Sequence, residues 1–308
     1  MEPIKEPTPL VLVTSSPHMH CGLTIGKSMR EVMLALVPAI IASVYYFRMS
    51  AAIVMVTCVV SAIVFETICN KVMHKPNTVQ DGSAALTGLL LAMCLPASMP
   101  PLFAAMGSMF AIVVGKAVFG GLGCNIFNPA HIGRAILLAS FPQQMTNWVL
   151  PATAAASDAV STATPLAVMR ATEKIWQAGG AASAAKLPDL MNLFWGNVGG
   201  SLGETCVPAL VLGGLYLIYK KLIDWRIPVF YLVTVAILTG VYGAVMGYPS
   251  TFPLYHLFAG GLMIGAFFMA TDWVTSPITK KGKIIYAIGL GVLTSLIRLR
   301  GSYTEGVC

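Results

Sequence analysis

The sequence predicts an all-α, polytopic membrane protein with about 9–10 transmembrane helices in two inverted repeats that contain broken or half helices. Three observations lead to this fold class: the composition, the lengths of the apolar runs, and the polar interruptions between them. Hydrophobic residues make up 56% of the chain and charged residues only 10%, and the mean hydropathy is +0.78. Soluble domains carry roughly a quarter charged residues, so the composition excludes an ordinary soluble protein.

The apolar runs approach the roughly 20 residues that a helix needs to cross a hydrocarbon core of about 30 Å. The predicted spans cover residues 31–47, 51–69, 102–119, 205–222, 227–246, 254–274 and 284–297. Two shorter apolar pieces, 84–95 and 129–141, adjoin Pro96 and the Asn128-Pro129 pair. Because proline interrupts helical hydrogen bonding, we expect half-helices or short spans there.

The distribution of basic residues predicts the orientation. Prolines interrupt the first 30 residues, so we expect no secretory signal and a cytoplasmic amino terminus. When successive segments alternate sides, most Lys and Arg fall on one face, which the positive-inside rule makes cytoplasmic. Arg298 and Arg300 are exceptions to this alternation. The net charge of +7 is spread along the chain rather than clustered, so no nucleic-acid partner is expected.

The chain divides into three predicted segments. Residues 1–141 form a first membrane repeat with a cytoplasmic amino-terminal segment, residues 142–190 an extracytoplasmic loop, and residues 191–308 a second repeat. Both repeats run through a short apolar piece, a full span and a polar break. Five spans in each half would give the halves opposite orientations, and the broken helices of such proteins meet around a site near the midplane.

A glycine-rich break lies between residues 115 and 134, with the sequence Gly-Lys-Ala-Val-Phe-Gly-Gly-Leu-Gly-Cys-Asn-Ile-Phe-Asn-Pro-Ala-His-Ile-Gly-Arg. Its backbone groups would go unsatisfied in lipid, so it must be buried in protein or line a polar cavity. No strand precedes it, which argues against a dinucleotide-binding loop. A tight packing turn and a ligand-lined break both stay open.

Acidic residues at membrane depth are costly and therefore candidates for function. Four of them lie near the ends of predicted spans: Glu66, Asp81, Glu204 and Asp272. Each could be a helix cap, or could take part in cation passage or cofactor contact. His131 and His256 have no second ligand at metal spacing, so we predict hydrogen-bonding roles and no metal site.

A polar loop, Asp158-Ala-Val-Ser-Thr-Ala-Thr-Pro-Leu-Ala167, interrupts the apolar pattern within the predicted outer segment. Taken alone, such a loop is a spacer, because Ser, Thr and Pro favour turns.

These motifs, together with Ala270-Thr-Asp-Trp-Val-Thr-Ser-Pro277 and Ser302-Tyr-Thr-Glu-Gly306, resemble the RnfD component of the Rnf electron-transport complex over nearly the whole chain. The corresponding membrane component of the sodium-pumping NADH:quinone reductase is a close relative and stays an alternative. The resemblance implies a bacterial inner-membrane subunit of a redox-driven translocase. It would relay electrons between ferredoxin and NAD⁺, coupled to Na⁺ or H⁺ transport, with the A, B, C, E and G proteins of the Rnf complex as partners.

The resemblance also implies covalent FMN. In that family the last Thr of a Ser-Gly-Ala-Thr-like tetrad carries FMN through a phosphoester, attached by a separate flavin transferase. The tetrad here is Ser161-Thr162-Ala163-Thr164, which makes Thr164 the expected FMN carrier. Asp158 and Ser161 would shape the loop around it or engage the metal of the transferase. Ala163 is a small neighbour, and we expect the acceptor hydroxyl to be exposed.

Relatives also hold a non-covalent riboflavin within the membrane domain. The two polar breaks, with Asn125 and Asn128 in one and Asp272 in the other, are the expected places for it, because non-helical backbone offers hydrogen bonds there. The competing classes are a passive, urea-channel-like transporter, whose fold is similar, and a scaffold without a cofactor. The sequence ends at Cys308, where the family continues with one more span, so we expect the second repeat to lack its last helix.

Overall fold

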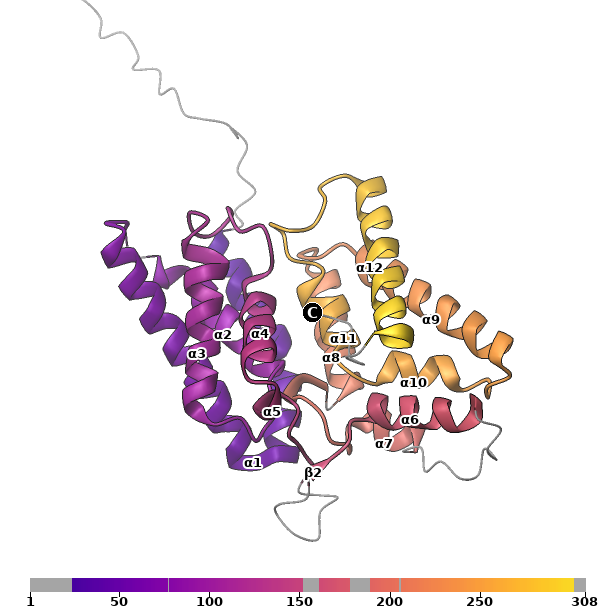
Figure 1. Cartoon of the computed structure of the whole chain (residues 1–308). Helices are drawn as coiled ribbons and strands as arrows, with labels where there is room; N and C mark the ends of the chain where they lie inside the picture. Colours follow the sequence, from indigo (N-terminus) through magenta and orange to yellow (C-terminus); the bar gives the residue numbers. More distant parts are fainter. Residues whose placement is uncertain (1–23, 77, 152–160, 178–188, 205, 302–308) are drawn as a thin grey trace, which may run out of the picture.

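The computed structural model describes residues 24–76, 78–151, 161–177, 189–204 and 206–301 (Figure 1). Within these ranges nearly all regular structure is helical, which confirms the predicted all-α class. The first half contains α1 (Ile25–Val72), η1 (Val79–Asp81), α2 (Ser83–Met93), α3 (Pro101–Ile112), the π-helix η2 (Val113–Ala117) and α4 (Pro129–Ser140). The middle contains α5 (Pro142–Met145), β1 (Trp148–Val149), β2 (Ser161–Thr162), α6 (Pro165–Gln177), α7 (Leu190–Trp195) and η4 (Leu202–Glu204). The second half contains α8 (Val207–Tyr219), α9 (Arg226–Met246), α10 (Phe252–Phe258), α11 (Leu262–Ile264), the π-helix η5 (Gly265–Met269) and α12 (Lys280–Arg300).

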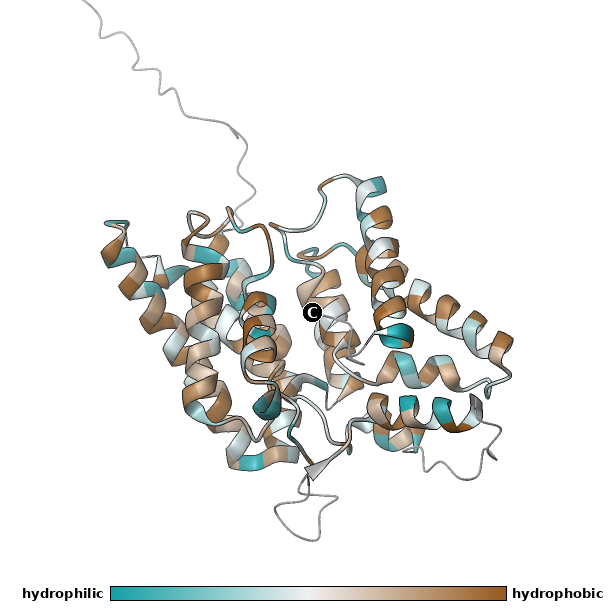
Figure 2. Cartoon of the chain, in the orientation of Figure 1, coloured by the Kyte–Doolittle hydropathy of each residue, from teal (hydrophilic) through white to brown (hydrophobic). Residues whose placement is uncertain are grey.

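In the described part of the chain, three helices are long and apolar enough to cross a membrane: α1, α9 and α12. A fourth candidate span is broken between α10 and α11, and α2, α3 with η2, and α8 are shorter apolar helices. Large apolar side chains such as Ile41, Val56 and Ile237 are about three-fifths exposed, at 64%, 60% and 58%. Hydrophobic residues run along α3, α9 and α12, and hydrophilic ones gather on α6 and the last turn of α12 (Figure 2). This is the surface expected of helices that face lipid.

The long helix α1 consists of two helices that meet at Arg48, whose φ of 52° and ψ of −133° are not helical. This break separates the predicted spans 31–47 and 51–69, as expected. Thr24 caps the start of α1, where its Oγ1 accepts a hydrogen bond from the backbone N–H of Lys27 at 3.3 Å. The first half therefore begins with two spans connected by a sharp turn.

Helix α2 is buried along almost its whole length between α1 and α3. The approach to α1 depends on Gly88, since a Cβ there would lie 2.6 Å from the carbonyl oxygen of Cys58. Ser108 on α3 donates to the same carbonyl at 3.1 Å. The pieces predicted at 84–95 and 129–141 appear as the short helices α2 and α4, as expected.

Both halves of the chain share one hydrophobic core. A single cluster of buried side chains includes Leu36 of α1, Leu90 of α2, Leu210 of α8 and Phe268 of η5. The halves therefore pack directly on each other, and elements from both can line one site. The division at residues 141 and 190 and the inverted relation of the repeats stay predictions.

The predicted span over 254–274 is broken in the structure. The helix bends by 64° between α10 and the segment formed by α11 and η5, at residues 259–261. Arg298 of α12 explains how this break is tolerated: it is buried and donates to the carbonyl of Ala259 at 3.1 Å and to that of His256. Arg298 thus binds carbonyls that the break leaves without helical partners, which gives this arginine a structural role inside the molecule.

The middle segment is anchored to both halves. Strands β1 and β2 pair antiparallel, with Trp148 opposite Thr162. Helix α6 contacts α10, and its Trp176 packs against Tyr248 with ring centroids 4.8 Å apart. β2 and α6 lie at one end of the molecule, and the loop that leads into α12 lies at the opposite end (Figure 1).

Candidate functional site

The predicted site residues fall into two separate groups. Asn125, Asn128 and Asp272 line one cavity of about 270 Å³. Thr164 and Ala163 lie between β2 and α6, and do not line this cavity. Asp158 lies outside the described residues, and Ser161 is described only by its backbone pairing with Val149.

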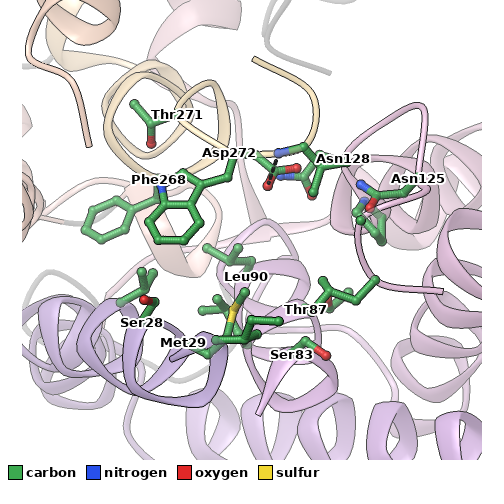
Figure 3. A pocket seen from close by; sticks show the side chains of 18 of the residues that line it. Ser28, Met29, Ser83, Thr87, Leu90, Asn125, Asn128, Phe268, Thr271 and Asp272 are labelled. Atoms are coloured by element: carbon green, nitrogen blue, oxygen red, sulfur yellow. Dashed lines mark hydrogen bonds between the residues drawn. The ribbon is translucent and has the colours of Figure 1, made fainter. Parts of the chain in front are cut away.

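The cavity brings the two predicted breaks together, although they are almost 150 residues apart in sequence. The side chain of Asn125 is buried, and it lines the same cavity as Asp272. Figure 3 shows Asn125, Asn128 and Asp272 along one side of the cavity. The sequence could suggest each break but not their contact, because the two belong to different halves of the chain.

The Asn-Pro break is built by side chains that replace backbone hydrogen bonds. Asn128 caps α4, where its Oδ1 accepts from the N–H of Ala130 at 3.0 Å, and Pro129 opens the helix. The amide of Asn125 donates to the carbonyl of Phe127 at 3.1 Å. The segment lines the cavity and also packs tightly, since a Cβ on Gly115 would lie 2.9 Å from the Cα of Pro129, so a packing turn and a ligand-lined break both stay open.

The second break is organised around Asp272. Its carboxylate accepts from the N–H of Val274 at 3.4 Å and from the hydroxyl of Thr275 at 3.3 Å. Thr271 Oγ1 donates to the carbonyl of Phe267 at 2.7 Å, at the end of η5. Trp273 Nε1 donates to the carbonyl of Leu222 at 2.7 Å, which holds the break against the loop after α8.

The opposite wall comes from α1 and α2, and sequence reasoning missed it. Figure 3 shows Ser28 and Met29 of α1 and Ser83, Thr87 and Leu90 of α2 on this side. Ser83, Thr87 and Leu90 are spaced four and three residues apart, so they share one helix face. The available signal was the pair of hydroxyl residues at this spacing in an otherwise apolar piece.

The lining of the cavity combines apolar walls with a few polar side chains. Most of the wall is apolar, with Phe268 and Leu90 among the large side chains. A few amide, carboxylate and hydroxyl groups interrupt it. Such a mixture is typical of small-molecule sites, where apolar walls give affinity and a few polar groups fix the orientation.

A buried ion pair borders the cavity. The ammonium of Lys116, in η2, lies 2.8 Å and 2.9 Å from the two carboxylate oxygens of Glu66 and 2.6 Å from the hydroxyl of Ser83. Lys116 and Glu66 are only 4% and 3% exposed. Glu66 is therefore neither a solvated cap nor an unpaired acid, and its partner could not be inferred from the sequence, where the two are 50 residues apart.

Two other candidate acids have different surroundings. Asp81 directly precedes Gly82, the N-cap residue of α2, and its Oδ1 accepts from the N–H of Ser83 at the start of that helix at 2.7 Å. Glu204 in η4 is buried, and its Oε1 has no hydrogen-bond partner within the described residues. Of the two predicted roles, Asp81 therefore has the one at a helix end rather than one in cation passage or cofactor contact.

Thr164 occupies the start of α6 and is buried, with 6% exposure, whereas Ala163 is exposed. The expectation of an exposed hydroxyl therefore does not hold for Thr164 itself. Its Oγ1 accepts from the N–H of Ala167 at 3.2 Å, and its carbonyl accepts from Val168 at 3.0 Å. The hydroxyl thus satisfies one of the free N–H groups at the helix start.

Helix α6 joins Thr164 to the broken helix. Glu173 of α6 lies with its Oε1 3.9 Å from His256 Nε2 of α10, and both side chains are buried. Burial raises the pKa of the Glu173 carboxyl to about 7, against a smaller opposing effect of the Arg170 charge. The ring nitrogens of His256 have no hydrogen-bond partner in the described part of the chain, so its predicted hydrogen-bonding role does not appear.

Comparison with known proteins places this architecture in a family. The model of the NQR2, RnfD, RnfE family matches residues 12–308. The chain is 50% identical to the D component of the proton-translocating ferredoxin:NAD(+) oxidoreductase complex of Clostridium ljungdahlii, over 96% of this chain and 88% of the relative.

Further relatives carry similar names. The chain is 44% identical to the D component of the Na(+)-translocating ferredoxin:NAD(+) oxidoreductase complex of Acetobacterium woodii, over 96% of this chain and 87% of that protein. It is 40% identical to the D component of the ion-translocating oxidoreductase complex of Rhodobacter capsulatus, over 93% and 85% of the two chains. The match over nearly the whole length, together with the long apolar helices, shows that this membrane-embedded chain belongs to the NQR2, RnfD, RnfE family.

Proposed function

We propose that the chain is a membrane subunit of an ion-translocating ferredoxin:NAD⁺ oxidoreductase. It would carry FMN covalently on Thr164, hold riboflavin in the cavity, and relay electrons coupled to Na⁺ or H⁺ transport. Its partners would be the A, B, C, E and G proteins of the Rnf complex, with a flavin transferase during maturation. The observation that carries the proposal is the similarity over 96% of the chain to the D components of such complexes.

The position of Thr164 at the start of α6 supports its role as the FMN carrier. A phosphoester on Oγ1 would put negative phosphate oxygens beside the free N–H groups of a 13-residue helix. Helix N-termini favour anions because these N–H groups and the helix dipole point toward them. The phosphate could therefore take over the hydrogen bond that Ala167 now donates to the hydroxyl.

The cavity supports the second flavin. Its volume of about 270 Å³ is just below the range of roughly 300–1,000 Å³ that is typical of small-molecule sites. Asn125 and Asn128 offer amide groups and Asp272 a carboxylate to a polar ring edge or to ribityl hydroxyls, while Phe268 offers an apolar face. A bound flavin supplies the redox chemistry, and the protein fixes its position and excludes water from it.

The two proposed flavin positions lie toward opposite ends of the molecule. β2 and Thr164 are at the end that charge placement makes extracytoplasmic, and the cavity is lined by residues from the loops at the other end, such as Leu222 and Trp273. Such an arrangement suits a protein that passes electrons across part of the membrane. A scaffold or a passive channel would need neither position.

Flavin fluorescence of the denatured protein in a gel tests the covalent assignment. We expect a fluorescent band when the chain is expressed with its flavin transferase, and none in Thr164→Val. Thr162→Val is the matched control and should keep the band, because it changes a neighbouring hydroxyl of the same tetrad. A dark wild-type band would contradict covalent FMN, and a fluorescent Thr164→Val band would contradict the choice of residue.

The non-covalent flavin is tested separately by acid precipitation of the purified protein. We expect the supernatant to contain riboflavin while FMN stays with the pellet. A passive transporter or a cofactor-free scaffold would release no flavin and give no fluorescent band.

A further inference from the structure

The cavity has two charged side chains among its described lining residues, Lys116 and Asp272. They stand on different walls. Lys116 is bonded to Ser83 of α2, and Asp272 lies across the cavity from Ser83 (Figure 3). The cavity therefore has a positively charged wall and a negatively charged wall.

The Lys116 ammonium is held in one position. It has three N–H groups and three acceptors, which are the two oxygens of Glu66 and the hydroxyl of Ser83. Lys116 comes from the π-helix η2, and π-helical turns occur often at functional sites. A flexible lysine has thus become a fixed charge at a cavity wall.

The carboxylates closest to Lys116 in this network are not among the residues that line the cavity. Glu66 does not line the cavity, and its Oε1 accepts from the hydroxyl of Thr78 at 2.7 Å. Thr78 in turn accepts from the amide of Asn70 at 3.0 Å. Ser83 donates onward to Asp81, which also does not line the cavity. Of the two members of the ion pair, Lys116 is therefore the one that lines the cavity, and Glu66 does not.

A buried ion pair is by itself weak evidence for a role in stability. Removing two charges from water is expensive, and well-packed apolar residues can replace a buried ion pair without loss of stability. An oriented pair beside a ligand cavity is better explained by its effect on the ligand. Reduction adds negative charge to a flavin, and a nearby cation in a medium of low dielectric constant favours that charge.

We propose that Lys116, oriented by Glu66 and Ser83, is the fixed positive charge that raises the midpoint potential of the flavin in the cavity. This inference rests on the proposed riboflavin site. Glu66 acts through Lys116, since its carboxylate partly cancels the field that the flavin experiences. Lys116 and Glu66 should therefore influence the potential in opposite directions.

The test is a redox titration of the non-covalent flavin in a Thr164→Val background, where no FMN signal is expected. Lys116→Met should lower the midpoint potential and Glu66→Gln should raise it. Each change should alter the ratio of reduced to oxidised flavin at least tenfold, about 30 mV for a two-electron couple. The double variant Lys116→Met/Glu66→Gln should return toward the parent potential, and Lys116→Arg should keep it.

Lys75→Met is the matched control. Lys75 is an exposed lysine whose ammonium donates to the carbonyl of Gly120 at 2.7 Å, and it does not line the cavity. Its removal should leave the potential unchanged. A purely structural ion pair predicts a different pattern, in which both single variants lose flavin or shift the potential in the same direction.

The outcomes separate the two proposals. The parent protein can contain riboflavin while Lys116→Met and Glu66→Gln leave the midpoint potential unchanged or shift it in the same direction. That result overturns the role of Lys116 and leaves the riboflavin site in place. If Lys116→Met loses its flavin, the midpoint potential of the flavin in Glu66→Gln is the test. An unchanged or lowered potential in that variant overturns the proposal. Parent protein that releases no riboflavin overturns the cavity assignment and this inference with it.

Discussion

The hydroxyl of Thr164 has one observed role and one proposed role. It caps α6 in the structure, and the same hydroxyl would be the attachment point for FMN. Since only 6% of the residue is exposed, a transferase can reach it only after the first turn of α6 has moved away. Attachment therefore fits best before α6 has packed against α10, and the phosphate would then cap the helix in place of the hydroxyl.

Glu173 gives α6 a pH dependence. Its pKa is raised by burial from an ordinary value of 4.5 to about 7, so over this range the folded chain binds more protons than the unfolded chain. The free energy of unfolding then falls as pH rises from about 4.5 to about 7. We expect Glu173→Gln to remove part of this fall, because the amide stays neutral.

Thermal unfolding of wild type and Glu173→Gln between pH 5 and 8 measures this effect. The groups near Glu173 include Arg170 on its own helix, His256 on α10 and Tyr242 on α9, and Arg298 lies beside His256. Lys174→Gln is the control, since Lys174 is exposed and adjacent in sequence. Parallel pH curves for wild type and Glu173→Gln would contradict a raised pKa.

At the scale of elements, glycines decide how closely the helices approach. A Cβ on Gly133 of α4 would lie 2.6 Å from the carbonyl of Gly107 on α3, just as one on Gly88 would meet Cys58 on α1. Without side chains at these points, the short helices can pack against the spans through their backbones. Hydropathy identifies the short helices, but only the three-dimensional packing identifies which of the 29 glycines are contacts.

Gly88→Ala tests this packing directly. The new methyl group would lie 2.6 Å from a backbone oxygen and 2.9 Å from the Cα of Val59, neither of which can move without shifting α1. We expect a loss of about 1–3 kcal/mol in the free energy of unfolding, which is typical of overpacking. Unfolding of the detergent-solubilised protein, followed by temperature or denaturant, measures it.

Gly289→Ala is the matched control, because Gly289 is an exposed position of α12 with no atom within 4 Å of an added Cβ. Ala favours the helical backbone over Gly by about 1 kcal/mol, so this variant should be unchanged or slightly more stable. Equal stability of both variants would show that α1 and α2 do not meet as closely as described.

At the scale of the whole molecule, the two proposed flavin positions lie toward opposite ends. Cysteine labelling with a membrane-impermeant maleimide tests this topology. Cys124 is exposed in the loop before α4, and Ala163 is exposed beside Thr164. In a variant without other cysteines, Cys124 should be labelled only from the cytoplasmic face and Ala163→Cys only from the outer face.

Labelling of both positions from one face would contradict the topology. Blocking with the same reagent before the membranes are opened provides the control, because a position that is already blocked cannot react afterwards.

Much of the fold could be predicted from hydropathy because lipid requires long apolar segments. The spans before and after Arg48 and the short helices α2 and α4 follow from this requirement. The bend between α10 and α11 could not be predicted, because it depends on a distant residue. Arg298, about 40 residues further along the chain, donates to the carbonyls of His256 and Ala259 at the break.

The candidate site also contains residues that the sequence predicts and residues that it does not. Asn125, Asn128 and Asp272 can be recognised in the sequence as polar residues in non-helical breaks at membrane depth. The wall formed by Ser83 and Lys116 could not be foreseen, because each residue has an ordinary sequence context until the packing of α1, α2 and α3 brings Glu66 beside them.

The π-helix η2 has a consequence for how this family can vary. A π-helical turn contains one residue more than an α-helical turn, so it amounts to a single-residue insertion in α3. Deleting one residue between 113 and 117 would restore an α-helix and rotate everything after it by about 100°. Lys116 would then leave the cavity wall. Homologues that keep the lysine in this position must therefore keep the length of this segment, even where its amino-acid sequence differs.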